Sequence, residues 1–382
     1  MLNRRTLRIK AMQAVFAYQT GKEAEYNIAL QIAQDKFLPD LNSMEVQDKE
    51  TLAKLREESE VAFKQAFQHG IDSINPDTSE PVKEAVNDGL EAYQVKVTNS
   101  IKHYKNRLIT DTSKIYDQYI ELLLLSLAIL DVVKAEKERK NIQQFNLKDN
   151  LILKAISNFE PLEKDRIKRN ISWHQHIDEV KLWYKDLIKK DDEYLYYDDL
   201  NRPTIEDDLA VILHIYKAII FKNEVVRNFF ESHDIGWAEN STVLKSMVLK
   251  TFKSITSENE EPILMELSKN WEDDLLFLNK LYDLTVENEK EYELLIAERS
   301  KNWEIERVAL TDRIILEMAV AEMINFASIP VKVTINEYIE VSKLYSTPKS
   351  KQFVNGILDV LSEELIKEGR IKKSGRGLLD NK

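Results

Sequence analysis

Residues 329–359 read IPVKVTINEYIEVSKLYSTPKSKQFVNGILD, and this stretch decides the fold because it predicts two consecutive helices. Pro330 interrupts whatever precedes it, since proline has no amide hydrogen with which to continue a helix. Thr334 and Glu337 then stand three residues apart, which is the spacing of a capping box. We therefore expect a helix to open at Thr334 and to run to about Tyr345.

The second of these helices is expected to follow Thr347 and Pro348, which match an N-cap and a proline at the first helical position. Gly369 is placed to end it, because glycine readily adopts the left-handed conformation that closes a helix. Between these limits the apolar residues recur at helical spacing along one face: Phe353, Ile357, Leu358, Leu361 and Leu365. This pattern predicts an amphipathic helix that packs on a core.

The rest of the chain is also expected to be helical. Only 8 Gly and 8 Pro occur in 382 residues, so helix breakers are few, and 43% apolar residues suffice for a sizeable core. Helices are expected at 262–268, 271–300 and 304–326 before the quoted stretch. The predicted fold class is all-α.

A further helix is expected at the N-terminus, from Arg4 or Arg5 to a stop at Gly21. Two apolar stripes run along it, so it should lie wedged between neighbouring helices. The stripes consist of Leu7, Ala11, Ala14, Val15 and Tyr18, and of Ile9, Met12 and Phe16.

The charge is distributed unevenly along the chain. The net charge of −12 argues against nucleic-acid binding by the whole surface. However, residues 1–22 hold five basic residues and no acidic one, and residues 367–382 hold six basic residues against two acidic ones. If the two ends lie together in space, they could confine an anionic partner to one surface.

The sequence carries no recognisable catalytic, metal or cofactor motif. It has no cysteine, no glycine-rich phosphate loop and no H-E-x-x-H pattern. His174 and His176 are too closely spaced to face the same way on a helix. We therefore predict that the protein is not an enzyme and needs neither metal nor cofactor.

The most apolar run, residues 119–133, contains Glu121 and Asp131 and is shorter than the ~20 residues that a membrane span needs. A buried core helix is predicted there. The lack of cysteine fits a cytoplasmic protein, and no membrane association is expected.

Four motifs together resemble the NusB family. They are the residues VKVTINEYIEVSK at 331–343, KSKQFVNGILD at 349–359 and DRIILEMAVAEM at 312–323, with RRTLR and QAVF at 4–8 and 13–16. They cover roughly residues 3–20 and 275–365. The middle of the chain resembles the large helical insertion of long NusB-like proteins.

The resemblance implies a NusB-like helical bundle built from the N-terminal helix and the C-terminal block. The domains expected are a basic helix at 1–22, a helical insertion at 23–265, the C-terminal block at 266–369 and a basic flexible tail at 370–382. The implied function is transcription antitermination. The protein would bind boxA-type RNA together with the ribosomal protein NusE and act on RNA polymerase, notably on ribosomal RNA operons.

Residue by residue, the resemblance implies an RNA-binding set made of basic and polar side chains at two helix starts. Glu322 matches the acid that faces NusE in the family, whereas Glu317 stands where the family often has arginine. Lys349 replaces a residue that is acidic in some members. The expected RNA-binding residues are Arg4, Arg5, Arg8, Lys10, Lys349, Ser350, Lys351 and Gln352.

Two expectations concern geometry. The N-terminal arginines should lie near Lys349 and Lys351, so that one surface holds the RNA. Gly356 falls inside a helix, where glycine costs about 1 kcal/mol relative to alanine, which suggests a close contact with another helix.

Two other functions are alternatives to transcription antitermination. The first is a helical scaffold or adaptor protein that keeps the NusB-like fold without binding RNA. The second is an RNA cytosine methyltransferase, because some of these enzymes carry a NusB-like domain. Such enzymes have a separate catalytic domain after that domain and use a cysteine nucleophile, and this sequence has no cysteine.

Overall fold

The computed structural model describes residues 2–42, 44, 46–142, 145–299 and 308–381. Every regular element among these residues is a helix, so the all-α prediction is confirmed. Over the same residues, no helix is both long and apolar enough to cross a membrane.

The chain forms two compact units. The terminal unit consists of Arg4–Ile109 and Leu275–Lys382, and the middle unit consists of Met1–Asn3 and Thr110–Asp274. The two ends of the chain therefore belong to one unit. The predicted insertion, 23–265, contributes to both units.

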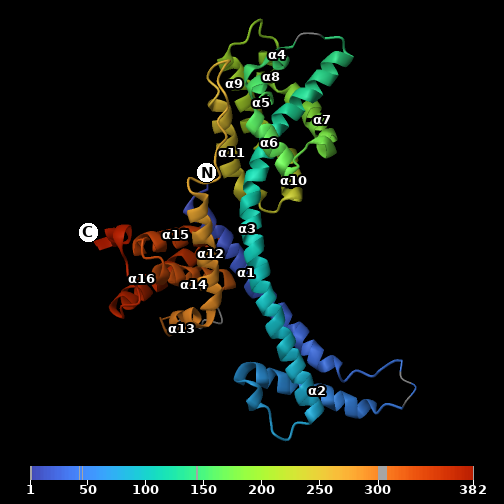
Figure 1. Ribbon diagram of the computed structural model, residues 1–382, viewed down its shortest axis with the longest axis vertical. Helices are drawn as coiled ribbons and strands as arrows, with labels where there is room; N and C mark the ends of the chain where they lie inside the picture. The colour runs from blue at the N-terminus through green and yellow to red at the C-terminus, as the bar shows by residue number, and fades with distance from the viewer. Residues whose placement is uncertain (1, 43, 45, 143–144, 300–307, 382) are drawn as a thin grey trace. The chain divides into compact units, whose positions relative to one another are not determined.

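The terminal unit contains helices from both ends of the sequence (Figure 1). Their bounds are α1 Arg4–Asp35, α2 Lys49–His69, η1 Ile71–Ser73, the first part of α3 Glu80–Arg139, most of α12 Trp271–Glu287, α13 Glu289–Arg299, α14 Leu310–Asn325, α15 Val331–Tyr345, α16 Ser350–Lys367 and η6 Gly375–Asn381.

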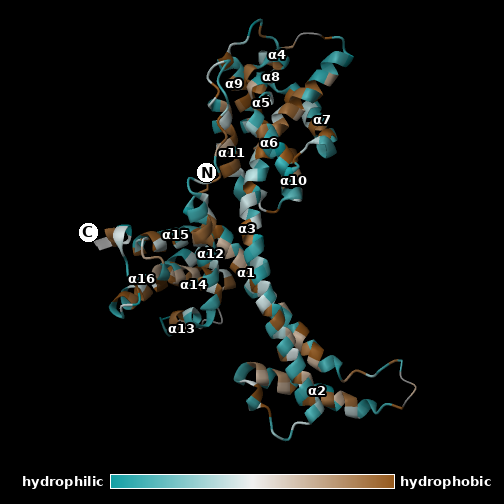
Figure 2. Cartoon of the chain, viewed as in Figure 1, coloured by the Kyte–Doolittle hydropathy of each residue, from teal (hydrophilic) through white to brown (hydrophobic). Residues whose placement is uncertain are grey.

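Helix α14 is the centre of this unit. Every residue from Ile314 to Met323 is buried, because α14 packs against α1, α13, α15 and α16 at once. A helix that is buried on all sides carries apolar residues all round, and the hydropathy colouring of α14 reflects this (Figure 2). The predicted helix at 304–326 thus begins at Leu310; residues 304–307 lie outside the described part.

Helix α1 does not end at Gly21, so that prediction is wrong. A Cβ atom at Gly21 would lie 3.1 Å from Tyr104 Oη of α3, so this glycine leaves room for the Tyr104 side chain. Beyond it, α1 packs with α2 and α3 around a separate apolar core. The buried members of this core are Ala29, Ala33, Phe37, Ala62, Phe63, Ala66, Ile74, Val82, Ala85 and Val86.

The middle unit contains the rest of α3 and a group of shorter helices around large aromatic side chains such as Trp183, Tyr216 and Trp237. The helices are α4 Asn146–Asp149, α5 Leu151–Ser157, α6 Glu160–Arg169, η2 His174–His176, α7 Ile177–Asp186, η3 Ile188–Lys190, α8 Asp192–Asp198, α9 Ile205–His214, the π-helix η4 Ile215–Ile220, α10 Glu224–His233 and α11 Trp237–Lys253.

The helix predicted at 262–268 is not formed. Tertiary hydrogen bonds take up the main chain there instead: Met265 N donates to Tyr119 Oη at 2.9 Å, and Leu2 N donates to Leu267 O at 2.7 Å. The predicted helix at 271–300 is divided into α12 and α13 at Asn288.

The two helices of the quoted stretch are present, but their starts differ from the prediction. Helix α15 begins at Val331, so Thr334 lies inside it and the predicted capping box is wrong. Helix α16 begins at Ser350, after Thr347 and Pro348. The predicted stop is confirmed, because α16 ends at Lys367 and Gly369 follows with a φ of 71°.

Gly356 is not at a helix contact, contrary to prediction, because a Cβ atom there would meet nothing within 4 Å. The substitution Gly356→Ala should therefore raise the unfolding free energy by roughly 0.5–1 kcal/mol, since alanine favours the helix without a clash.

Gly89→Ala is the matched control for this prediction. Its Cβ atom would lie 2.7 Å from Ala29 O, so this substitution should lower stability. Unfolding of both variants followed by circular dichroism gives the comparison. A loss of stability in Gly356→Ala would contradict the claim that a Cβ atom at this position meets no neighbour.

Candidate nucleic-acid interface

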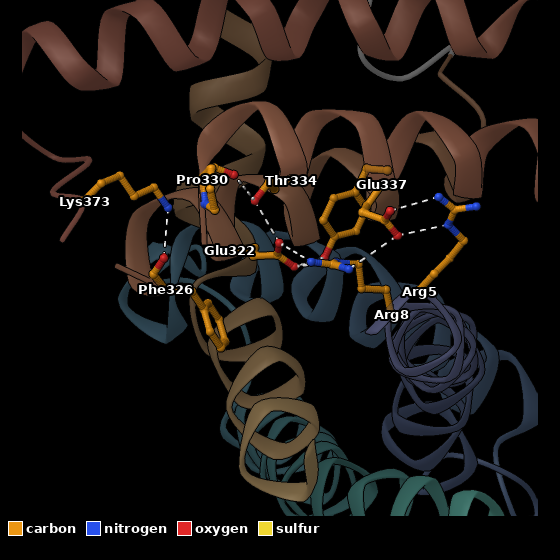
Figure 3. A network of polar contacts seen from close by, with 9 residues as sticks. Arg5, Arg8, Glu322, Phe326, Pro330, Thr334, Glu337 and Lys373 are labelled. Carbon is orange, nitrogen blue, oxygen red and sulfur yellow. Dashed lines mark hydrogen bonds and ion pairs between the residues drawn. The ribbon is translucent and has the colours of Figure 1, made fainter. Parts of the chain in front are cut away.

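A buried ion pair joins the first helix to the C-terminal block (Figure 3). Arg8 Nε and Nη2 donate to Glu322 Oε2 and Oε1 at 2.8 and 2.7 Å, and the two side chains are 3% and 0% exposed. Thr334 Oγ1 donates to the same carboxylate at 2.8 Å, and Tyr338 Oη does so at 3.3 Å. Four hydrogen-bond donors, two from α1 and two from α15, therefore satisfy Glu322 of α14.

This geometry gives Arg8 and Glu322, which were predicted to bind RNA and a protein partner, a structural role. The guanidinium of Arg8 is occupied inside the protein, so in this conformation it cannot reach an RNA phosphate. Glu322 is equally inaccessible to a protein partner. Both residues hold α1, α14 and α15 together, and any effect on binding would come through that role.

The other N-terminal cations lie nearer the surface. Arg5 makes two hydrogen bonds to Glu337 of α15, at 3.0 and 2.9 Å, while 41% of its side chain stays exposed. The Arg4 guanidinium lies 4.3 Å from the centre of the Phe277 ring and is half-buried. Lys10, by contrast, is buried. Arg4 and Arg5 are thus the accessible members of this group.

The second predicted group lies at the start of α16, as expected. Lys349, Lys351 and Gln352 are exposed. Ser350 is buried and donates a 2.6 Å hydrogen bond to Asp312 in the first turn of α14. Ser350 therefore fixes the start of α16, and the three exposed residues remain available to a ligand.

The two groups do not come into contact. Arg8 binds Glu322 near the C-terminal end of α14, and Ser350 binds Asp312 near its N-terminal end. Ten helical residues separate these two acids, which is roughly 15 Å along the axis. The arginines were expected to lie near Lys349 and Lys351; because their anchor points on α14 are this far apart, a ligand that touches both groups must be extended.

The structure adds residues that sequence reasoning missed. The Phe277 and Phe326 rings are 5.2 Å apart, and Lys280 Nζ lies 4.9 Å from the centre of the Phe326 ring. Lys373 Nζ donates to Phe326 O at 3.0 Å. Nothing in the local sequence marks these residues, because they come from three separate segments that meet only in the fold.

Glu317, which departs from the family pattern, is fully buried. Gln19 Nε2 donates to its Oε2 at 2.8 Å, and Arg313 Nε is 3.7 Å from Oε1, too far for a hydrogen bond. Burial raises the pKa of Glu317 to about 8, and the nearby carboxylates of Glu289 and Glu293 add to this effect. Glu317 therefore belongs to the α1–α14 interface.

These observations define an all-α protein whose two ends build one bundle with basic side chains at its edge. Comparison with known proteins gives the family. The sequence profile of the NusB family matches residues 242–363. The chain is 41% identical over 125 residues to the transcription antitermination protein NusB of Geobacter sp.. This match covers 31% of this chain and 83% of that protein.

Two further relatives carry the same name. The protein of Chloroherpeton thalassium is 43% identical over 104 residues, and that of Salinibacter ruber is 42% identical over 103 residues. Each match covers 27% of this chain, and it spans 49% and 64% of the respective relative. The chain belongs to the NusB family.

A solved structure of NusB from T. maritima also matches the chain. The identity is 26%, and the match covers 36% of this chain and 86% of that structure, with a TM-score of 0.25.

Removing one partner of the buried pair should be costly. Arg8→Ala would leave the Glu322 carboxylate buried without its cation, and such changes cost about 3–5 kcal/mol of unfolding free energy. Arg5→Ala removes a half-exposed cation from Glu337 and should cost less than about 1 kcal/mol. Denaturant unfolding compares the two variants, and equal losses would contradict a structural role for Arg8.

Glu317 should make stability depend on pH. Its pKa in the folded protein, about 8, lies above the usual 4.5, so folding takes up a proton between these values and stability falls as pH rises through that window. Glu317→Gln removes this loss.

The variant should therefore match the wild type near pH 4.5 and exceed it by at least about 1 kcal/mol at pH 8, since one pKa unit corresponds to about 1.4 kcal/mol. Thermal unfolding at the two pH values measures the difference. A constant difference between variant and wild type would show that Glu317 does not titrate in this window.

Proposed function

We propose that this protein is a non-enzymatic transcription antitermination factor. In this proposal it binds boxA-type RNA together with the ribosomal protein NusE and acts on RNA polymerase, notably during transcription of ribosomal RNA. Membership of the NusB family supports the proposal, as do the three relatives named transcription antitermination protein NusB.

The observation that carries the RNA-binding part is the position of four cations on the terminal unit. Arg4 and Arg5 are accessible at the start of α1, and Lys349 and Lys351 are exposed at the start of α16. Helix starts also present free amides and a positive dipole, which favour phosphate. The anchor points of the two groups on α14 are roughly 15 Å apart, so a single-stranded RNA that crosses the surface of the unit could meet both groups.

Ser350 and Arg8 enter this proposal as positioning residues. Ser350 holds the start of α16 on α14, and Arg8 holds the start of α1 there. Gln352 is exposed beside Lys351 and could hydrogen-bond RNA directly. Lys10 is buried and is not part of the proposed surface.

A scaffold protein without RNA binding is the second candidate, and one observation favours it. Arg8 is fully engaged with Glu322, and Arg5 is bidentate with Glu337, so part of the basic charge is neutralised within the protein. In the proposed function, RNA would have to compete with Glu337 for Arg5.

The test is RNA binding by the full chain. Arg4→Ala/Arg5→Ala and Lys349→Ala/Lys351→Ala should each weaken binding of a boxA-type RNA about tenfold or more. Each should also lower the slope of log affinity against log salt by about 1.4, because a single-strand phosphate contact contributes about 0.7.

Lys54→Ala/Arg56→Ala is the matched control, since it removes the same charge from exposed positions on α2. Gel shifts with and without NusE at several salt concentrations give the affinities. If the wild type shifts no RNA under either condition, the scaffold function is favoured instead.

A further inference from the structure

The basic C-terminal segment is the feature that the proposed function does not use. The sequence predicts a flexible tail at residues 370–382, but the structure gives residues 370–379 defined contacts. Ile371 is buried, Ser374 N donates to Ala327 O at 3.0 Å, and Lys373 Nζ donates to Phe326 O. The tail is therefore seated on the turn that follows α14.

Gly377 makes this seat specific. A Cβ atom at Gly377 would lie 2.0 Å from Ala327 O, which no side chain permits. The close approach of Gly377 to the α14–α15 turn thus fixes the main chain next to Arg376. Arg376 and Lys372 are exposed, and neither makes an ion pair with a described residue.

The seated tail is connected to Arg4 of α1 through two aromatic residues. Arg4 contacts Phe277, Phe277 contacts Phe326, and Phe326 O accepts from Lys373, with separations of 4.3, 5.2 and 3.0 Å. Lys280 is exposed and covers the Phe326 ring. Arg4 and Lys280 therefore lie over the two rings, and Lys373 binds the carbonyl of Phe326.

Some of these cations have a structural use. Lys373 and Lys280 donate to Phe326 O and Asn325 O, so they neutralise the negative end of α14. Lys372 and Arg376 are not among the residues that bind these carbonyls. Their charge would repel a basic partner and attract an anionic one.

We infer that the tail, residues 370–379, is a further RNA-contacting segment in which Lys372 and Arg376 bind backbone phosphates of the strand that Arg4 contacts. The inference rests on the proposed function. Proteins that bind single-stranded RNA combine cations for the phosphates with aromatic rings on which bases stack. Phe326 is half-buried and bordered by cations, so its surroundings fit such a site. The proposed ligand is single-stranded RNA, bound on the side of the α1 arginines and away from Lys349 and Lys351 at the start of α16.

The experiment uses the full chain and a labelled single-stranded RNA with a boxA-type element. Lys372→Ala/Arg376→Ala should weaken binding about tenfold and lower the salt slope by about 1.4, as expected for two lost phosphate contacts. Lys54→Ala/Arg56→Ala again serves as the control of equal charge and should bind as the wild type does.

Gly377→Ala tests whether RNA binding needs the seated tail or only its positive charge. The substitution keeps every charge but prevents the tail from packing against Ala327. It should also weaken RNA binding, with the unfolding midpoint measured to confirm that the bundle is intact. Wild-type affinity in Gly377→Ala, together with a loss in the double variant, would overturn the claim that the seat matters.

The outcomes keep the two proposals apart. If the wild type binds RNA and the double variant binds equally well with the same salt slope, the tail inference fails and the proposed function stands. If the double variant loses only the protein partner, the tail recognises protein and the inference is overturned. If the wild type binds no RNA, the proposed function itself fails.

Discussion

The rest of the terminal unit depends on the ion pair between Arg8 and Glu322. It joins two residues that are 314 positions apart in the chain, and neither is accessible to solvent. A charged pair is tolerated in such a place only when its remaining hydrogen-bonding atoms are satisfied. Thr334 and Tyr338 supply these partners from α15, so the pair ties the start of α1 to both α14 and α15.

This arrangement explains how an acidic protein can present a basic surface. The net charge is −12, yet both ends of the sequence are basic, and the fold brings both to the end of α14 where Glu322 lies. Arg4 reaches Phe277 there, and the C-terminal tail reaches Phe326. Lys349 and Lys351 form a second basic place at the other end of α14, so the candidate interface is elongated.

Local signals in the sequence predicted the helices better than they predicted the site. The stop at Gly369 was correct because it needs only a left-handed residue after a helix. Thr334 was misread as a cap because its hydroxyl binds Glu322, a contact that no local pattern contains. Arg8 was expected to bind RNA for the same reason: a buried partner 314 residues away cannot be inferred from spacing, and neither can the meeting of Phe277, Phe326 and Lys373.

The most direct measurement of the central claim is native-state hydrogen exchange of the intact chain. If the two ends form one cooperative unit, amides in the buried part of α1, such as Val15, should open with the same free energy as amides in α14, such as Val320, within about 1 kcal/mol. If the amides of α1 open several kcal/mol more easily than those of α14, the first helix is an appendage, and the buried ion pair does not hold the unit together.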